Sequence, residues 1–243
     1  MRIAIIDADR PDPRVRHRWP TYGGMCADWL GEALPEARFA LVNVAEGADF
    51  PDPSAFDAVL LTGSRAGVYE DHPWLPPYIG SLRQWRDAGR PVGGICFGHQ
   101  IMAAAFGGRV EKSDRGWAIG HARHSVTEAG RSLFPDHASL TALSFHQDQV
   151  VDLPPGAEVL LRNDHSPHGG IAYPFAALSV QFHPEFGPDY VADLLDRMDL
   201  GDLPEAVVQD SRDGLSQPID SAEVARAFAR FYRDPRGART GAG

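Results

Sequence analysis

The chain has 243 residues, of which 43% are apolar and 23% are charged, a composition typical of a globular protein with a sizeable core. Its formal net charge of −10 disfavours nucleic acid as a partner, because the phosphates would be repelled. No apolar run reaches the roughly eighteen residues of a membrane-spanning helix, and two cysteines, Cys26 and Cys96, are too few for a disulfide framework. Met1–Asp7 enters an apolar strand without a secretory leader, so we expect a cytoplasmic protein.

Apolar strands alternate with amphipathic helices through the first half of the sequence. The expected strands are Arg2–Asp7, Phe39–Val44, Ala58–Thr62 and Val92–Cys96, and the expected helices are Gly24–Leu34, Trp74–Ala88 and Gly98–Phe106. This alternation predicts a mostly parallel central sheet with helices on both faces, a flavodoxin-like three-layer α/β sandwich. Functional sites in this architecture lie at the carboxyl ends of the strands.

The pattern changes after Arg109 to short runs of alternating polarity. These runs predict a small antiparallel extension of the sheet, with strands at Ile119–Val126, Thr141–Phe145, Val159–Arg162 and Ala177–Gln181. Helices are expected at Asp189–Asp199 and Ser221–Tyr232, the second with Ser221 as its N-cap. We predict one main domain over residues 1–200, followed over residues 201–243 by a helical appendage and a flexible tail.

The run from Pro91 to Gln100 contains the spacing Gly94-x-Cys96-x-Gly98, which is typical of a nucleophile elbow. Such an elbow holds one side chain on a tight turn from strand to helix, where the crowded backbone leaves no room for a Cβ at the flanking positions. The helix dipole would favour the thiolate of Cys96, the form that attacks carbonyl carbons. A lone cysteine in an apolar run is more often a buried small hydrophobe, and a second motif is needed to favour chemistry.

That second motif is the run Gln181-Phe-His-Pro-Glu185. Alternate residues of a strand point to the same side, so His183 and Glu185 are expected to project together. Cys96, His183 and Glu185 would then supply a nucleophile, a base and a carboxylate that orients the base.

The segments Gly94–Gln100 and Ser179–Glu185 resemble the two signature segments of class I (triad-type) glutamine amidotransferases, and the resemblance extends from Met1 to about Leu195. It implies cleavage of a glutamyl γ-amide through a Cys96 thioester, with His183 as acid and base and Glu185 orienting it. The segment Leu60–Arg65 also resembles the family's oxyanion loop, and this resemblance implies that the N–H groups of Gly63 and Phe97 hold the oxyanion. Many members carry Gly-Gly-Pro where this chain has Thr-Gly-Ser-Arg.

The resemblance also implies residues that bind the substrate. Gln100 matches the family's Cys-x-Gly-x-Gln pattern, and His146 and Gln147 lie where many members have Ser-His-Gly-Asp. His146 has the alternative interpretation of a surface histidine. Ser64 lies where the protein would contact either the leaving group or the amino-acid end of the glutamyl group. Arg65 is either a partner for a substrate carboxylate or a solvated loop charge.

We expect no metal and no cofactor. His121-x-x-His124 and His165-x-x-His168 each lack an evident third ligand. No GxxxxGK[ST] loop is present, so an ATP-using synthetase would be a separate subunit.

Three functions remain open for a small-molecule substrate. The first is an amidotransferase subunit that feeds ammonia to a synthetase. The second is a freestanding γ-glutamyl peptidase or hydrolase, and the third is a non-catalytic binding module. The segment Thr62–Trp74 resembles stand-alone members of the family and favours the second. We expect slow glutamine hydrolysis by the isolated chain and a preference for larger leaving groups.

Overall fold

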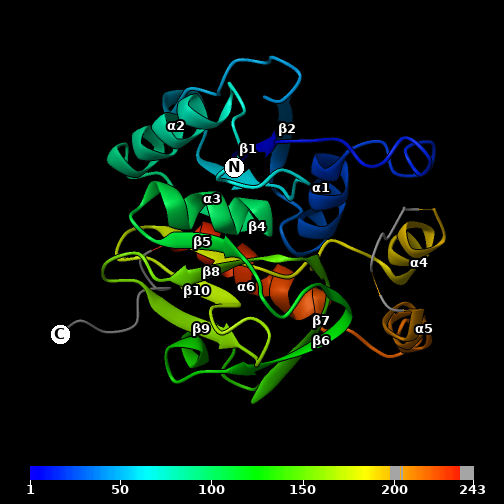
Figure 1. Cartoon of the computed structure of the whole chain (residues 1–243). Coiled ribbons are helices and arrows are strands. Elements are labelled where there is room, and N and C mark those ends of the chain that lie inside the picture. Colours follow the sequence, from blue (N-terminus) through cyan, green and yellow to red (C-terminus); the bar gives the residue numbers. More distant parts are fainter. Residues whose placement is uncertain (198–202, 204, 236–243) are drawn as a thin grey trace.

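The computed structural model describes residues 1–197, 203 and 205–235. Within this part, a nine-stranded sheet has the order β2-β1-β3-β4-β11-β10-β9-β6-β7, and a second sheet pairs β5 with β8 (Figure 1). The strands are β1 (Arg2–Asp7), β2 (Arg38–Asn43), β3 (Ala58–Leu61), β4 (Val92–Ile95), β5 (Arg109–Lys112), β6 (Ala118–Val126), β7 (Ser139–His146), β8 (Asp148–Asp152), β9 (Glu158–Arg162), β10 (Gly170–Ala172) and β11 (Ala177–Val180). The helices are α1 (Tyr22–Ala33), α2 (Leu75–Asp87), α3 (Phe97–Ala105), α4 (Pro188–Arg197), α5 (Glu205–Gly214) and α6 (Ser221–Arg233), with short 3₁₀ turns at Pro53–Ala55 and Ala129–Ser132.

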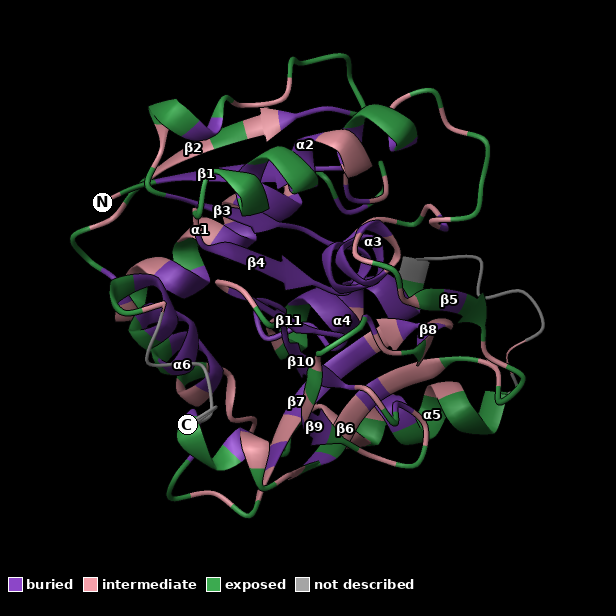
Figure 2. Cartoon of the chain, turned by 90° about the vertical axis from the view of Figure 1, so that its left-hand side faces the viewer, coloured by how far each residue is buried: buried purple, intermediate pink, exposed green. Residues whose placement is uncertain are grey.

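The five strands from β2 to β11 pair in parallel, which confirms the predicted α/β architecture. Strand β1 shows why helices cover both faces. Ile3 and Ile5 pack into the core on the side of α1 and α6, whereas Ala4 and Ile6 pack into the core on the side of α2 and α3. Figure 2 shows the resulting buried strands between these helices. The carboxyl ends of β1, β3, β4 and β11 therefore meet at one edge, where the predicted site residues lie.

The antiparallel extension continues the same sheet through β10, β9, β6 and β7. Its far strand returns to the parallel half at an isolated bridge between Leu143 and His183. Strands β5 and β8 form the separate antiparallel pair, with Lys112 opposite Asp148. The extension therefore places the end of β7 and the start of β8 beside the segment that follows β11.

Helix α6 packs in the core with α1, where Phe228 lies against Trp29 and the Tyr232 hydroxyl donates to the Val59 carbonyl at 2.9 Å. Its predicted N-cap is wrong. Asp220 is the cap residue, because its backbone carbonyl accepts from the N–H groups of Glu223 and Val224, while its carboxylate accepts from Thr141 N–H and makes no capping bond. The Ser221 hydroxyl instead donates to the Pro184 carbonyl. The predicted domain boundary at residue 200 and the tail after residue 235 lie outside the described residues.

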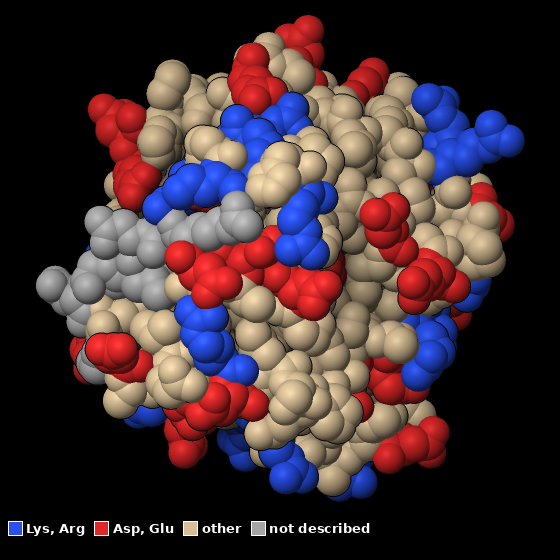
Figure 3. Space-filling model, turned by 90° about the vertical axis from the view of Figure 1, so that its right-hand side faces the viewer, with Lys and Arg blue, Asp and Glu red and all other residues tan. Residues whose placement is uncertain are grey.

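No helix in the described ranges is both long and apolar enough to cross a membrane. The face seen in Figure 3 carries acidic and basic side chains side by side. Basic groups on this face are thus interspersed with acidic ones and do not form a broad positive surface of the kind that binds nucleic acid.

Candidate active site

Cys96 stands at the turn between β4 and α3, with φ 52° and ψ −104°, and no other non-glycine residue in the described part of the chain has a positive φ. The flanking glycines are required by contact. A Cβ on Gly94 would lie 2.5 Å from the Met102 sulfur, and a Cβ on Gly98 would lie 2.5 Å from the Leu61 carbonyl oxygen. The strained backbone of Cys96 is thus held by close packing of helix and strands, as expected for a nucleophile elbow.

His183 is fixed on three sides. Its Nδ1 lies 2.8 Å from Oε1 of Glu185, and its backbone N–H donates to the Leu143 carbonyl at 2.8 Å. Its ring stacks on Phe186, with the ring centroids 3.8 Å apart and the planes within 3° of parallel. Because Glu185 occupies Nδ1, the Nε2 edge of the ring remains for Cys96.

The electrostatics of this cluster favour the protonated form of His183. Burial lowers the pKa of His183, but the Cys96 thiolate and the Glu185 carboxylate outweigh burial and raise that pKa to about 10. The Glu185 side chain is fully buried and directs one oxygen at the imidazole. An imidazolium beside a thiolate is the state expected of an activated cysteine nucleophile.

The loop after β3 comes very close to these groups. A Cβ on Gly63 would lie 2.8 Å from Cε1 of His183 and 3.7 Å from Cβ of Cys96. The Gly98 N–H donates to the Thr62 carbonyl at 3.0 Å, which ties this loop to the start of α3. Within the described residues, neither the Gly63 nor the Phe97 N–H donates to a backbone carbonyl. Phe97 N–H is next to the thiol in the chain, and Gly63 N–H is close to it in space. Neither donor is used by a backbone carbonyl, as an oxyanion site requires.

Ser64 and Arg65 shape this loop through contacts within the protein. The Ser64 hydroxyl accepts from Ala66 N–H at 3.0 Å and reaches the Ala8 carbonyl at 3.4 Å. Arg65 donates from Nε and Nη2 to the two oxygens of Asp9, at 2.8 and 2.9 Å. The guanidinium considered for solvent or for a substrate carboxylate is thus engaged by Asp9.

Gln100 joins α3 to the start of β8. Its Nε2 donates to the Asp148 carbonyl at 3.0 Å and lies 3.3 Å from Oε1 of Gln181. The interpretation of His146 as a surface histidine is wrong, because this last residue of β7 is only 4% exposed. Burial lowers the pKa of His146 well below its usual value, so the ring is neutral at pH 7. Its neighbour Gln147 accepts from Ser113 N–H through its backbone carbonyl.

Cys96 opens into a pocket of about 200 Å³, a volume suited to a small amino-acid derivative. The pocket brings together all the residues proposed from the sequence except Glu185 and Phe97, which lie behind His183 and Cys96. It also contains residues that the sequence analysis missed: Asp12, Tyr22, Tyr69, Glu70, Lys112, Trp117, Phe145, Asp148, Phe186, Tyr190 and Leu194. Phe186 and Asp148 could have been found, since each directly adjoins a motif.

The chain matches the family model described as glutamine amidotransferase class-I over residues 38–192. It belongs to the class-I glutamine amidotransferase family. A glutamine amidotransferase from Methylobacillus flagellatus has the same fold, with a TM-score of 0.77 at 19% identity over 100% of this chain and 96% of that one.

Two relatives of this chain differ in how much of their own length the match covers. Gamma-glutamyl peptidase 5 of Arabidopsis thaliana is 28% identical over 235 residues, which cover 93% of this chain and 90% of that protein. GMP synthase [glutamine-hydrolyzing] of Burkholderia cenocepacia is 38% identical over 145 residues, which cover 56% of this chain. The match spans only 26% of that second protein.

Three of the four paired histidines outside the pocket take part in hydrogen bonds with the protein, whereas the two ring nitrogens of the buried His124 have no hydrogen-bond partner among the described residues. Nε2 of His121 lies 3.0 Å from the Gln217 carbonyl oxygen, and Nδ1 of His168 lies 2.9 Å from the Val150 carbonyl oxygen. Nδ1 of His165 lies 2.9 Å from the Gln149 amide. Among the described residues, no three His, Cys, Asp or Glu side chains are grouped closely enough to hold a metal ion.

Proposed function

We propose that this protein hydrolyses the γ-amide of glutamine or of another γ-glutamyl compound through a thioester on Cys96. The observation that carries the proposal is the cluster of a strained elbow cysteine and a His183–Glu185 pair at the floor of one small pocket. Membership of the glutamine amidotransferase family supports the same chemistry.

The reaction proceeds in two halves. The Cys96 thiolate attacks the γ-carbonyl carbon, and the carbonyl π electrons move to oxygen, where the N–H groups of Gly63 and Phe97 hold the negative charge. As the C–N bond breaks, the His183 imidazolium gives its proton to the leaving nitrogen, and a γ-glutamyl thioester remains. Neutral His183 then takes a proton from water, whose oxygen attacks the thioester. Collapse of the second intermediate expels the Cys96 thiolate, releases glutamate and restores the starting ion pair.

Glu185 positions the base throughout. Its carboxylate accepts from Nδ1 of His183 at 2.8 Å, so the proton transferred in each half is the one on Nε2. Stacking on Phe186 prevents the ring from turning away. Both contacts keep the Nε2 edge directed at the sulfur and at the leaving nitrogen beside it.

The two cysteines offer a matched test. Cys96→Ala should abolish release of ammonia or amine from glutamine and from γ-glutamyl amides. The Cys26→Ala protein should retain turnover. The Cys26 thiol is fully buried in the hydrophobic core beneath α1, and burial raises its pKa well above the usual value. Turnover that survives Cys96→Ala in purified protein contradicts the proposal.

A freestanding hydrolase is the form of this activity that we favour, because the chain covers nearly the whole length of a relative named γ-glutamyl peptidase. The second candidate is a glutaminase subunit with a separate synthetase partner, which the similarity to part of a GMP synthase favours. Either role is proposed for the cytoplasm. Turnover by the isolated chain supports the first, and turnover that begins only when a co-purified synthetase is added supports the second.

A further inference from the structure

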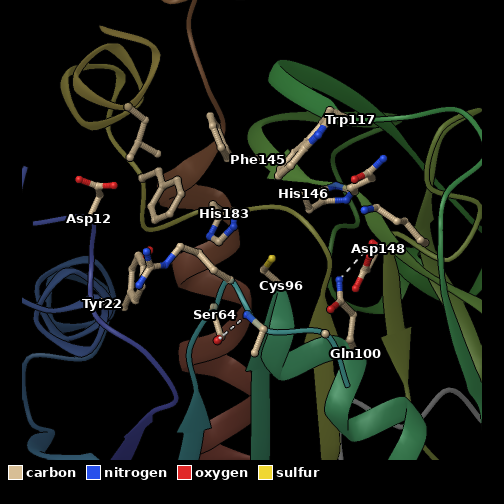
Figure 4. A pocket seen from close by; sticks show the side chains of 18 of the residues that line it. Asp12, Tyr22, Ser64, Cys96, Gln100, Trp117, Phe145, His146, Asp148 and His183 are labelled. Carbon is tan, nitrogen blue, oxygen red and sulfur yellow. Dashed lines mark hydrogen bonds between the residues drawn. The ribbon is translucent and has the colours of Figure 1, made fainter. Parts of the chain in front are cut away.

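The pocket extends to two opposite sides of Cys96 (Figure 4). Gln100, His146 and Asp148 lie on one side, and His183, Tyr22 and Asp12 lie on the other. The first side contains the charged residues Lys112 and Asp148, which stand opposite each other in register across β5 and β8, together with the aromatic ring of Trp117. The second side is built mainly from α1 and α4. The two sides therefore offer different chemical surroundings to the two ends of a γ-glutamyl substrate.

The direction in which a substrate lies follows from the proton transfer. His183 must reach the nitrogen that leaves, so the amine of a γ-glutamyl amide extends on the His183 side of Cys96. The amino-acid head of the glutamyl group then lies on the opposite side, beside Gln100 and Asp148. This head carries an amino and a carboxyl group, which match the charges of Asp148 and Lys112.

The His183 side is lined by the side chains of Tyr22, Phe186, Tyr190 and Leu194, here called the leaving-group wall. The Phe186 ring continues from His183, with the Tyr22 ring 6.4 Å away and the Tyr190 ring 4.4 Å away between centroids. Leu194 extends the wall from the next turn of α4, and the exposed fraction of each of the four side chains is at most 7%. Apart from the hydroxyl groups of Tyr22 and Tyr190, the wall is hence an apolar, closely packed surface, and carbon buried against it gains free energy.

The charged groups near the wall are already paired within the protein, Asp12 with Arg14 and Arg65 with Asp9. Arg65 is the cationic side chain among the described residues that line this side, and its Nε and Nη2 already donate to Asp9. Asp12 lines the same side, and hydrogen bonds from Arg14 lower its pKa to about 2, so it stays anionic. A second carboxylate would therefore find the Arg65 fork already occupied by Asp9, so Arg65 would not offset the cost of its desolvation.

We propose that the leaving-group wall binds the carbon skeleton of an apolar amine, so that the preferred substrates are γ-glutamyl amides of such amines and not γ-glutamyl peptides or glutamine. This inference rests on the Cys96 chemistry proposed above. The products are glutamate and the free amine, with water supplying the oxygen, and no other reactant is needed.

Three substrates separate the contributions of the carbon skeleton and of the carboxylate. γ-Glutamyl-isobutylamide and γ-glutamylvaline differ by one carboxylate on the leaving amine, and glutamine lacks the whole skeleton. We expect kcat/KM for the isobutylamide to exceed the values for both others by roughly tenfold or more. Cys96-dependent turnover with no advantage for the isobutylamide overturns the inference and keeps the proposed function.

Two neighbouring leucines of α4 provide matched variants, since Leu194 lines the pocket and Leu195 is buried to a similar extent away from it. Leu194→Ala should lower the ratio of kcat/KM for the isobutylamide to that for glutamine about tenfold. Leu195→Ala should leave this ratio unchanged within about twofold, and an equal fall in both variants overturns the inference.

Absence of Cys96-dependent turnover for all three compounds, both by the isolated chain and with a co-purified synthetase, would overturn the proposed function, and the wall can still be tested by binding. Calorimetric titration of Cys96→Ala protein should then give a roughly tenfold lower Kd for the isobutylamide than for γ-glutamylvaline. Equal dissociation constants, or tighter binding of γ-glutamylvaline, overturn the inference.

Discussion

The contact between Gly63 and His183 leads to a quantitative prediction for the substitution Gly63→Ala. The backbone of Gly63 has no positive φ, so alanine fits its conformation, and the N–H group is retained. The new Cβ, however, would lie 2.8 Å from Cε1 of His183, where carbon atoms in contact need about 3.5–4.0 Å. The imidazole or the loop must therefore move by roughly 1 Å.

Neither group moves freely. His183 is held by Glu185, by the Leu143 carbonyl and by the stacked ring of Phe186, so a shift misplaces Nε2 relative to Cys96. A misplacement of about 1 Å costs about 10²-fold in rate, which corresponds to roughly 2.7 kcal/mol of transition-state stabilisation. We expect kcat/KM for hydrolysis of a γ-glutamyl amide to fall about 100-fold. The free energy of unfolding should decrease by about 1–3 kcal/mol.

The assay compares kcat/KM and thermal unfolding of Gly63→Ala with those of Gly80→Ala. Gly80 lies within α2, and a Cβ there would have no atom within 4 Å. Gly80→Ala should keep full activity and gain about 0.5–1 kcal/mol of stability, because glycine weakens a helix. If Gly63→Ala retains the kcat/KM of the unchanged protein, the reasoning about close packing of the loop against His183 is refuted.

Three further predictions concern ionisable groups. Glu185→Gln should lower kcat about 10³-fold or more in a folded protein, because the imidazole loses the partner that fixes its tautomer, and the exposed Glu128→Gln is the control; equal rates would contradict the role. In Cys96→Ala protein the pKa of His183, measured by NMR titration, should fall below about 10, because burial lowers it and the thiolate is gone; a value that stays near 10 would exclude the ion pair. In the intact protein this raised pKa lies above the usual 6.5, so its contribution to stability is complete below about pH 6.5 and is lost as pH rises through about 10. Burial raises the pKa of Asp7 from 3.8 to about 6, so its ionisation destabilises the fold as pH rises through 6. Asp7→Asn should therefore increase the free energy of unfolding in urea by up to about 3 kcal/mol near pH 7.5 and leave it unchanged below about pH 4. A variant that is less stable than the unchanged protein at both pH values would disprove this.

The sequence predicted the parts of the fold that depend on local pattern. The apolar runs of β1, β3 and β4 and the glycines at 94 and 98 set the strand-to-helix geometry within a few residues, so the elbow could be placed without tertiary information. Strand β5 could not be predicted in this way, since only Val110 of its four residues is buried and no alternation is visible. It forms because β8 supplies its hydrogen-bonding partner.

Contacts between distant segments limited the prediction of the site. Tyr22 and Leu194 line the same side of the pocket although they belong to the first and fourth helices, and nothing in either local sequence indicates that they meet. Asp9 binds Arg65 across a separation of 56 residues, a pairing that neither of the two interpretations of that arginine included. The N-cap of α6 was also misassigned, and the hydrogen bonds that join the actual cap residue, Asp220, to Thr141 in the distant strand β7 are not visible in the local sequence.

The central claim is that Cys96 carries the glutamyl group during turnover. The most direct measurement is mass spectrometry of the protein quenched with acid during hydrolysis of a γ-glutamyl amide, followed by peptide mapping. We predict a γ-glutamyl adduct on Cys96 that is lost at neutral pH by thioester hydrolysis and is absent from Cys96→Ala protein. An adduct on another residue, or hydrolysis by Cys96→Ala protein at the rate of the unchanged protein, would contradict the account.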